Sequence, residues 1–192
     1  MASLLKPINL KRKRNNINKG FLIVILIGTL ILVDGYRIKL KKQSMSFVDV
    51  DTSAAANISY GETPINIKIN SLGIDLEVRE AKMRDGWWEL SDKFALHQPN
   101  TAFPGQRGNT IIYAHNDSDL FGPLIKKSKN GQEIEITLKQ GTVLKYKIAE
   151  IKEVNRTNGS DIKNSTNEVL TLYTCTGIFD SKRLIVKAIP LF

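Results

Sequence analysis

The sequence predicts an all-β protein: a closed antiparallel β-barrel of about eight strands with short helical turns, preceded by an N-terminal membrane helix. Three observations support this fold class. Between residues 63 and 192, short segments in which apolar and polar side chains alternate follow one another. Turn-forming pairs separate these segments, and no long stretch has the 3.6-residue period of an amphipathic helix. Near the N-terminus, an uncharged apolar run lies between basic residues.

The strands are predicted from the two-residue period of half-buried β-structure. In chain order the period covers residues 64–70, 72–78, 109–114, 132–138, 142–154, 168–174 and 183–189. Turns are predicted between them at Pro104-Gly105, Asn130-Gly131, Gln140-Gly141 and Asn158-Gly159. Residues 120–127 and 160–164 can each form a helical turn or two. Many short strands joined by short loops are typical of a closed or nearly closed antiparallel barrel.

The composition fits one globular domain plus an appendage. The chain has 192 residues, of which 42% are hydrophobic and 24% charged, and this excludes a disordered or collagen-like chain. Its single cysteine cannot close an intrachain disulfide, so a packed core must hold the fold.

The net charge of +9 belongs entirely to the N-terminal segment. Residues 1–42 carry ten basic side chains and one acidic one, whereas residues 43–192 carry 18 of each sign. Binding to nucleic acid needs a basic face on the folded domain. The charge distribution therefore argues against a nucleic-acid partner.

A membrane anchor is predicted at residues 21–36. Its core is the uncharged run from Phe21 to Val33, which is short against the roughly 20 residues of a spanning helix. Counting Gly20 and letting Tyr36, Arg37 and Lys39 reach into the membrane interface lengthens the run, since long basic side chains snorkel. A cleaved signal peptide and a buried core helix are the alternatives. The first is disfavoured because no small-residue cleavage site directly follows the run.

The basic residues also predict the orientation. Six precede the run and four follow it, which favours a cytoplasmic N-terminus, residues 1–20, and an extracellular domain. We therefore expect a single-pass protein of the cell membrane. Residues 37–62 include a stretch rich in small and polar side chains, as in a stem, and the barrel is predicted to occupy residues 63–192.

Three residues carry the candidate chemistry: Cys175, His115 and Arg183. A lone cysteine beside apolar strand residues is most often a small buried hydrophobe. Cys175, however, ends a predicted strand, and Arg183 opens the next strand eight residues later. A cation there favours the thiolate and can donate hydrogen bonds to an oxyanion. His115 also ends a strand, so the three residues are the parts of an activated thiol nucleophile.

The segment Thr171-Leu172-Tyr173-Thr174-Cys175 resembles the TLxTC signature of sortases, the membrane-bound cysteine transpeptidases of mainly Gram-positive bacteria. The resemblance extends over about residues 63–190. Its further motifs are Arg183-Leu184-Ile185-Val186, Pro104 to Ile112 leading into His115, Phe121-Gly122-Pro123-Leu124 and Gly131-Gln132-Glu133-Ile134. Ala114 and Asn116 depart from the family, which usually has Gly before the histidine and often Arg after it.

The resemblance implies a role for each residue. Cys175 is the nucleophile that attacks the threonine carbonyl of an LPxTG-like sorting motif near the C-terminus of an exported protein. His115 is the general acid and then the general base, and Arg183 steadies the oxyanion. The partners implied are that exported protein and an amine acceptor, either a peptidoglycan precursor or a pilin lysine. Thr171 and Thr174 either line the substrate cleft or bond within the sheet.

The polar loop at residues 155–167 precedes the cysteine strand, and the corresponding loop of sortases helps to form the substrate groove. We therefore expect this loop to influence motif preference.

No cofactor is predicted. Some sortases bind calcium through scattered acids near the cleft, but Glu133 and Glu135 alone do not indicate such a site, and no His/Cys pair has zinc spacing. His97 and the pair Trp87-Trp88 are expected to have packing roles.

Two other function classes are open. One is a membrane-tethered, non-catalytic β-barrel binding module in which Cys175 is inert. The other is a different cysteine enzyme, either a hydrolytic protease, whose acceptor is water, or an L,D-transpeptidase. The last lacks its histidine-glycine-cysteine signature in this sequence.

Overall fold

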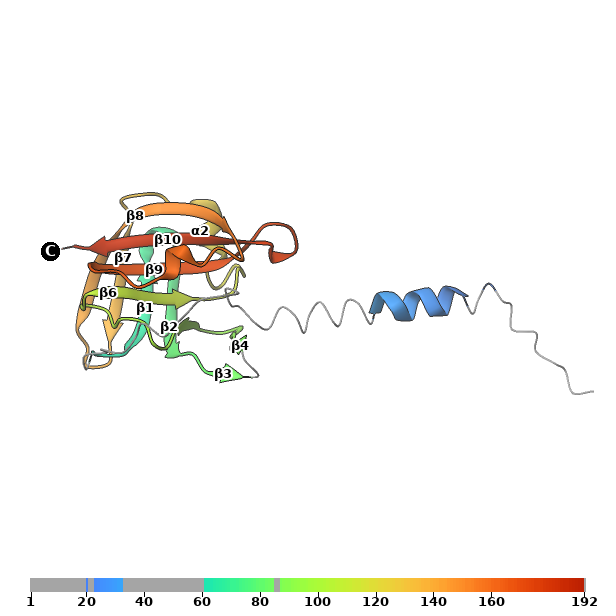
Figure 1. The fold of residues 1–192 in the computed structure, drawn as a ribbon, viewed down its shortest axis with the longest axis horizontal. Helices are drawn as coiled ribbons and strands as arrows, with labels where there is room; N and C mark the ends of the chain where they lie inside the picture. The colour runs from blue at the N-terminus through green and yellow to red at the C-terminus, as the bar shows by residue number, and fades with distance from the viewer. Residues whose placement is uncertain (1–19, 21–22, 33–60, 85–86, 192) are drawn as a thin grey trace, which may run out of the picture. The chain divides into compact units, whose positions relative to one another are not determined.

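The structure is a computed structural model that describes residues 20, 23–32, 61–84 and 87–191. The chain divides into two units, residues 1–42 and 43–192. In the first unit residues 23–32 are helical (Figure 1, blue). Within the described part of the chain, no helix combines the length and the apolar character needed to cross a membrane. Residues 21–22 and 33–36 of the predicted anchor, and residues 37–60 of the predicted stem, lie outside the described residues.

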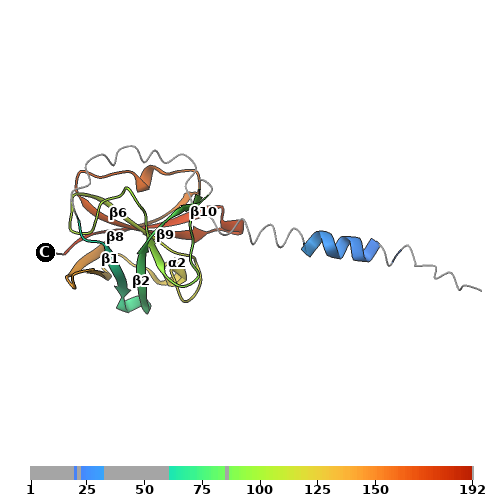
Figure 2. The same ribbon diagram turned by 90° about the horizontal axis from the view of Figure 1, so that it is seen from below.

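Eight strands close the second unit into a barrel in the order β1-β2-β5-β6-β9-β10-β8-β7 (Figures 1 and 2). Their bounds are β1 Pro64–Ile69, β2 Ile74–Glu80, β5 Ala95–His97, β6 Gly108–Tyr113, β7 Glu133–Leu138, β8 Val143–Asn155, β9 Glu168–Thr176 and β10 Lys182–Pro190. A separate hairpin pairs β3 (Met83–Arg84) with β4 (Trp87–Trp88). The helical turns are η2 (Asn70–Leu72), α2 (Gly122–Lys127), η3 (Ser160–Ile162) and η4 (Ile178–Asp180).

The predicted closed barrel is confirmed, and each strand expected from the alternating pattern is present within a few residues. Three predicted turns also contain a glycine in the left-handed conformation, with φ of 83° at Gly105, 91° at Gly131 and 90° at Gly141. The strand β5 was not predicted, because Ala95–His97 is only three residues long and all three are buried, so no alternation of buried and exposed positions marks it.

The expectation of a wholly antiparallel barrel is wrong at two places. The pairings β2–β5 and β6–β9 are parallel. A parallel pair needs a crossover connection of about a dozen residues or more. Residues 81–94 supply it for the first pair, and α2, β7 and β8 lie within the second connection. Side-chain alternation alone does not distinguish these pairings from antiparallel ones.

Apolar side chains form two clusters, one inside the barrel and one outside it. The inner cluster contains residues of all eight strands, for example Ile67, Ile112, Leu172 and Val186. The outer cluster covers the outward face of β5, β6, β9 and β10, and consists of Ala81, Leu96, Ile111, Tyr113, Ile162, Tyr173, Cys175 and Ile185, with Trp88, Leu90, Phe94 and Val154 packed against it. The candidate cysteine therefore belongs to the outer face.

Candidate active site

The ladder between β9 and β10 brings Cys175 and Arg183 together. The two residues are direct partners across this antiparallel pair, so their side chains lie on the same face. Directly opposed Cβ atoms in such a pair are about 5 Å apart. Both residues are buried, at 8% exposure for Cys175 and 4% for Arg183.

His115 reaches the same place from the other side of β9. The parallel pair β6–β9 aligns Tyr113 with Tyr173, and the Ala114 amide donates to the Tyr173 carbonyl at 3.4 Å. His115 lies two residues after Tyr113, as Cys175 lies two residues after Tyr173. The Phe121 amide donates to the His115 carbonyl at 3.0 Å, which fixes the backbone after β6. The strand order β6, β9, β10 therefore gives the order His115, Cys175, Arg183 at one end of the sheet.

The guanidinium of Arg183 is held by the turn that precedes it. Its Nη1 donates to the backbone carbonyls of Asp180 and Lys182, both at 2.9 Å. Phe179 and Asp180 have left-handed φ angles of 55° and 57°, which are uncommon for residues other than glycine. The turn conformation thus determines where this buried cation lies relative to the thiol.

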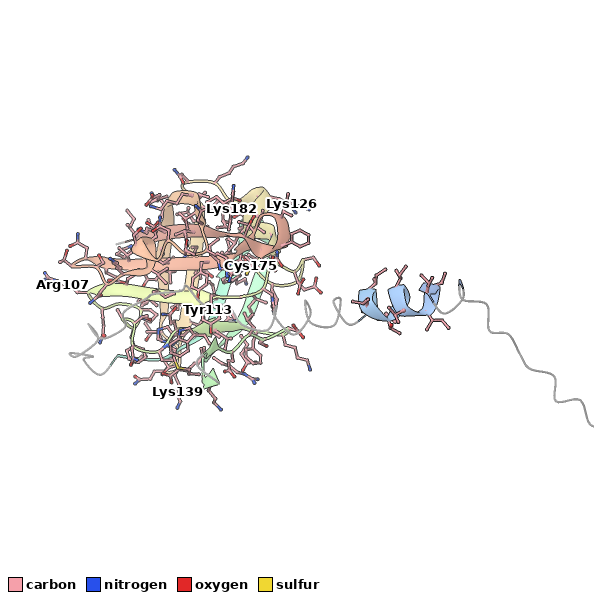
Figure 3. The ribbon with its side chains drawn as sticks, turned by 45° about the vertical axis from the view of Figure 1, so that its right-hand side comes forward. Arg107, Tyr113, Lys126, Lys139, Cys175 and Lys182 are labelled. Atoms are coloured by element: carbon pink, nitrogen blue, oxygen red, sulfur yellow. The ribbon has the colours of Figure 1, made fainter. Side chains whose placement is uncertain are left out.

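Two stacked tyrosines belong to the same outer cluster as the thiol. The ring centroids of Tyr113 and Tyr173 lie 5.1 Å apart with an interplanar angle of 19°, on the neighbouring strands β6 and β9. Figure 3 shows where Tyr113 and Cys175 lie in the domain. Burial raises the pKa of the Tyr173 phenol, Arg183 opposes this shift and Cys175 adds to it. Both groups are therefore within electrostatic reach of Tyr173.

The segment before β5 contributes an acidic contact to the histidine. Asp92 Oδ1 lies 3.5 Å from His115 Nε2, although the Asp92 side chain is 90% exposed. Tyr113 holds this segment by donating from its hydroxyl to the Glu89 carbonyl at 2.8 Å. Asp92 could not be predicted from the sequence, because no motif marks it and only the packing of residues 87–94 brings it to the site.

A protein-family model described as a sortase domain matches residues 67–191. The chain belongs to the sortase family. A search of curated proteins found no match. The match spans His115, Cys175 and Arg183, and the family is one of transpeptidase enzymes.

Solved structures of other sortases have the same fold. A lid mutant of sortase A from Corynebacterium diphtheriae is 26% identical, with a TM-score of 0.58 over 69% of this chain and 73% of that one. A pilus-related sortase C of Group B Streptococcus is 25% identical, with a TM-score of 0.58 over 77% and 74%. A Clostridium perfringens sortase D5 transpeptidase is 26% identical, with a TM-score of 0.57 over 73% and 86%.

The two threonines of this sortase that were predicted to line the cleft or bond within the sheet are completely buried. Thr174 lies on the opposite face of β9 from Cys175 and donates to the Ala114 carbonyl at 2.8 Å. Thr171 shares the face of Cys175 and donates to Asn109 Oδ1 at 2.7 Å. Both hydroxyls thus bond within the domain, and a contact with substrate stays a prediction.

The second histidine of the sortase, His97, lies in β5 and is 1% exposed. Its Nε2 contacts the Ala102 carbonyl and the Thr101 hydroxyl, and its ring packs near Phe103. Burial lowers the pKa of His97 to about 4, a shift that the Ala102 contact opposes. This neutral, packed side chain fits the packing role expected for it, as does the partly buried Trp88 of the outer cluster.

The acidic pair considered for calcium lies on β7. Glu135 contacts Lys145 at 3.3 Å, which gives this carboxylate a cationic partner from β8. Among the residues that the structure describes, no group of three or more His, Cys, Asp or Glu side chains is arranged to hold a metal ion.

Proposed function

We propose that this sortase cleaves an LPxTG-like sorting motif of exported proteins through a thioester on Cys175 and transfers the acyl group to an amine. The observation that carries the proposal is the paired Cys175 and Arg183 across β9 and β10, with His115 at the end of the neighbouring β6. These groups supply a nucleophile, a cation and a proton carrier at one end of one sheet.

In the first step, Cys175 Sγ attacks the carbonyl carbon of the motif's threonine. The Arg183 guanidinium stabilises the oxyanion of the tetrahedral intermediate, and it suits this role because its backbone contacts hold it in place before substrate binds. The C–N bond to the following glycine then breaks. His115 gives its proton to the departing amine, which leaves a thioester on Cys175.

In the second step, an amine attacks the thioester carbonyl. His115 accepts the proton of the incoming amine, a new amide bond forms, and the C–S bond breaks to release the thiolate of Cys175. A thioester suits this chemistry because it keeps the acyl group activated until an amine arrives. We propose a peptidoglycan precursor or a pilin lysine as the acceptor, and the reaction as one of surface anchoring or pilus assembly.

The proposed reaction needs no cofactor, since thiol, imidazole and guanidinium together supply its chemistry. We further propose that residues 21–36 anchor the enzyme in the cell membrane and that the barrel is extracellular. This placement is supported by the basic residues around Phe21–Val33 and would bring the site to exported substrates.

The test is a ligation assay. The full chain is incubated with a library of LPxTG-like peptides, with and without triglycine, beside Cys175→Ala, and the products are identified by mass spectrometry. A ligated product that requires both triglycine and Cys175 supports transpeptidation and identifies the motif. Products of water alone would indicate a hydrolytic protease, and no Cys175-dependent product would favour the binding module.

A further inference from the structure

We infer that a network of polar contacts, centred on the buried Asp161, Asn109 and Thr171, fixes the loop between β8 and β9, residues 156–167, and thereby sets the affinity for the substrate peptide. The network consists of Asp161 with Lys152 and Lys187, and of Asn109 with Thr171. The inference rests on the proposed function, because it assigns positioning residues to the substrate side of the same site.

The loop runs along the outside of the barrel (Figure 2). Cys175 belongs to the outer apolar cluster. Its short helix η3 contributes Ile162, which is buried in the same outer cluster as Cys175. Within residues 156–167 only Asp161 and Ile162 are buried, so the loop contacts the barrel at its middle while its flanks are more exposed.

The β9–β10 ladder fixes the distance between the thiol of Cys175 and Lys187, the strand residue that Asp161 of the loop contacts. Three facing residue pairs, or rungs, of this ladder point to the outer face. In order they are Cys175 with Arg183, Tyr173 with Ile185, and Thr171 with Lys187. Alternate residues of a strand are about 6.6 Å apart, so the third rung lies about 13 Å from the first. This span equals about four residues of an extended peptide.

An ionic contact holds the loop to two strands. The Asp161 carboxylate lies 2.5 Å from Lys152 Nζ and 3.1 Å from Lys187 Nζ. Burial opposes ionisation of Asp161, but the two ammonium groups outweigh it and hold the pKa of the carboxyl below its ordinary value. Because Lys152 belongs to β8 and Lys187 to β10, one loop side chain connects both strands.

An amide contact holds the loop to two further strands. Asn109 Nδ2 donates to the Lys163 carbonyl at 3.0 Å and lies 3.5 Å from the Asp161 carbonyl. Since backbone carbonyls only accept hydrogen bonds, the amide nitrogen must face the loop and its oxygen must face Thr171. The buried Thr171 hydroxyl donates to that oxygen at 2.7 Å and so fixes the orientation of Asn109.

The catalytic candidates are positioned by the strands of the barrel and not by the loop. Cys175 and Arg183 lie on strands and His115 lies two residues after the end of β6, so the barrel positions them independently of the loop contacts. A loop released at its middle must be ordered again when a peptide binds, and this ordering weakens binding. The network should therefore act on KM and leave kcat nearly unchanged.

The test compares matched variants of the full chain. Asp161→Asn removes the charge at constant shape, and Thr171→Val removes the hydroxyl donor. Glu150→Gln is the control, because Glu150 contacts the same Lys152 at 2.8 Å but belongs to β8 and not to the loop. For Asp161→Asn and Thr171→Val we expect the peptide KM to rise about fivefold or more with kcat within about twofold of wild type. The control should match wild type.

Hydrogen exchange supplies a readout that needs no activity. The amides of residues 156–167 should exchange about tenfold faster in Asp161→Asn and Thr171→Val, and at the wild-type rate in the control. Lys187→Gln, placed on a strand, should give a smaller change because Lys152 still holds Asp161. Unchanged loop exchange, or a loss of kcat at constant KM, would overturn the inference. A wild-type chain without Cys175-dependent product would instead count against the proposed function, while the exchange data would still decide whether the network holds the loop.

Discussion

The buried His97 should make this domain lose stability in mild acid. The pKa of His97 is about 4 in the folded protein, against an ordinary value of 6.5, because burial disfavours its charged form. The unfolded chain therefore binds the proton first as the pH falls. The stability associated with neutral His97 is complete above pH 6.5 and is lost as the pH falls from 6.5 toward 4.

The size of the effect follows from the two pKa values. At 1.36 kcal/mol per pKa unit, the loss is about 2 kcal/mol at about pH 5 and about 3 kcal/mol at about pH 4. This is a large fraction of the roughly 5–15 kcal/mol that stabilises an ordinary domain. Asp161 and Glu153 have lowered pKa values, so their contributions are lost only below their ordinary values of 3.8 and 4.5. The pH range above 5 therefore isolates the effect of histidine.

The assay is urea unfolding of the barrel at several pH values, followed by near-UV circular dichroism, for wild type and His97→Gln. The variant retains a side-chain donor toward the Ala102 carbonyl but does not titrate. The difference between the two unfolding free energies should change by about 2 kcal/mol between about pH 7.5 and pH 5. Subtracting the variant removes every contribution to the pH dependence that the two proteins share. Two parallel curves over this range would refute the reasoning.

Three further predictions concern the site and its support. Arg183→Lys should lower kcat/KM about 100-fold in the ligation assay, because lysine lacks the guanidinium that contacts two backbone carbonyls on the face of the thiol. Activity within about threefold of wild type would contradict the oxyanion role. Asp92→Asn should change kcat/KM by less than about threefold, since an ionic contact to a 90% exposed carboxylate is weak in water. A drop of about 100-fold would instead mean that His115 depends on Asp92 for its function. Thr174→Val should lower the free energy of unfolding by about 1–2 kcal/mol in urea, because the Ala114 carbonyl loses its buried hydroxyl donor; an unchanged unfolding midpoint would show that this bond is dispensable.

The long alternating strands could be predicted from sequence, whereas β5 and the parallel pairings could not. Strands such as β7 alternate buried and more exposed residues, and that alternation is visible in the sequence. Ala95–His97 is short and buried on both faces, so it shows no period. Whether two strands run parallel depends on the path of the connection between them, and periodicity carries no information about that path.

The site was partly predictable for the same reasons. Cys175 and Arg183 flank one tight turn, so an antiparallel hairpin places them opposite each other, and their spacing of eight residues indicates this. His115 lies 60 residues before Cys175 and reaches it through the parallel β6–β9 pair. The sequence pattern placed both at strand ends, but only the family resemblance indicated that they meet. Lys152, Asp161 and Lys187 lie far apart in the sequence. They meet because β8 and β10 are paired neighbours in the sheet and the loop contacts both strands.

Intact-mass spectrometry of the acyl-enzyme tests the central proposal most directly. The full chain is mixed with the peptide motif identified by ligation, in the absence of an amine, and the protein mass is recorded at short times. The proposal predicts an added mass equal to that of the peptide fragment ending at its threonine, less one water. The adduct should be absent in Cys175→Ala and discharged by triglycine. Ligated product without this adduct on Cys175 at any time, or an adduct that persists in Cys175→Ala, would contradict it.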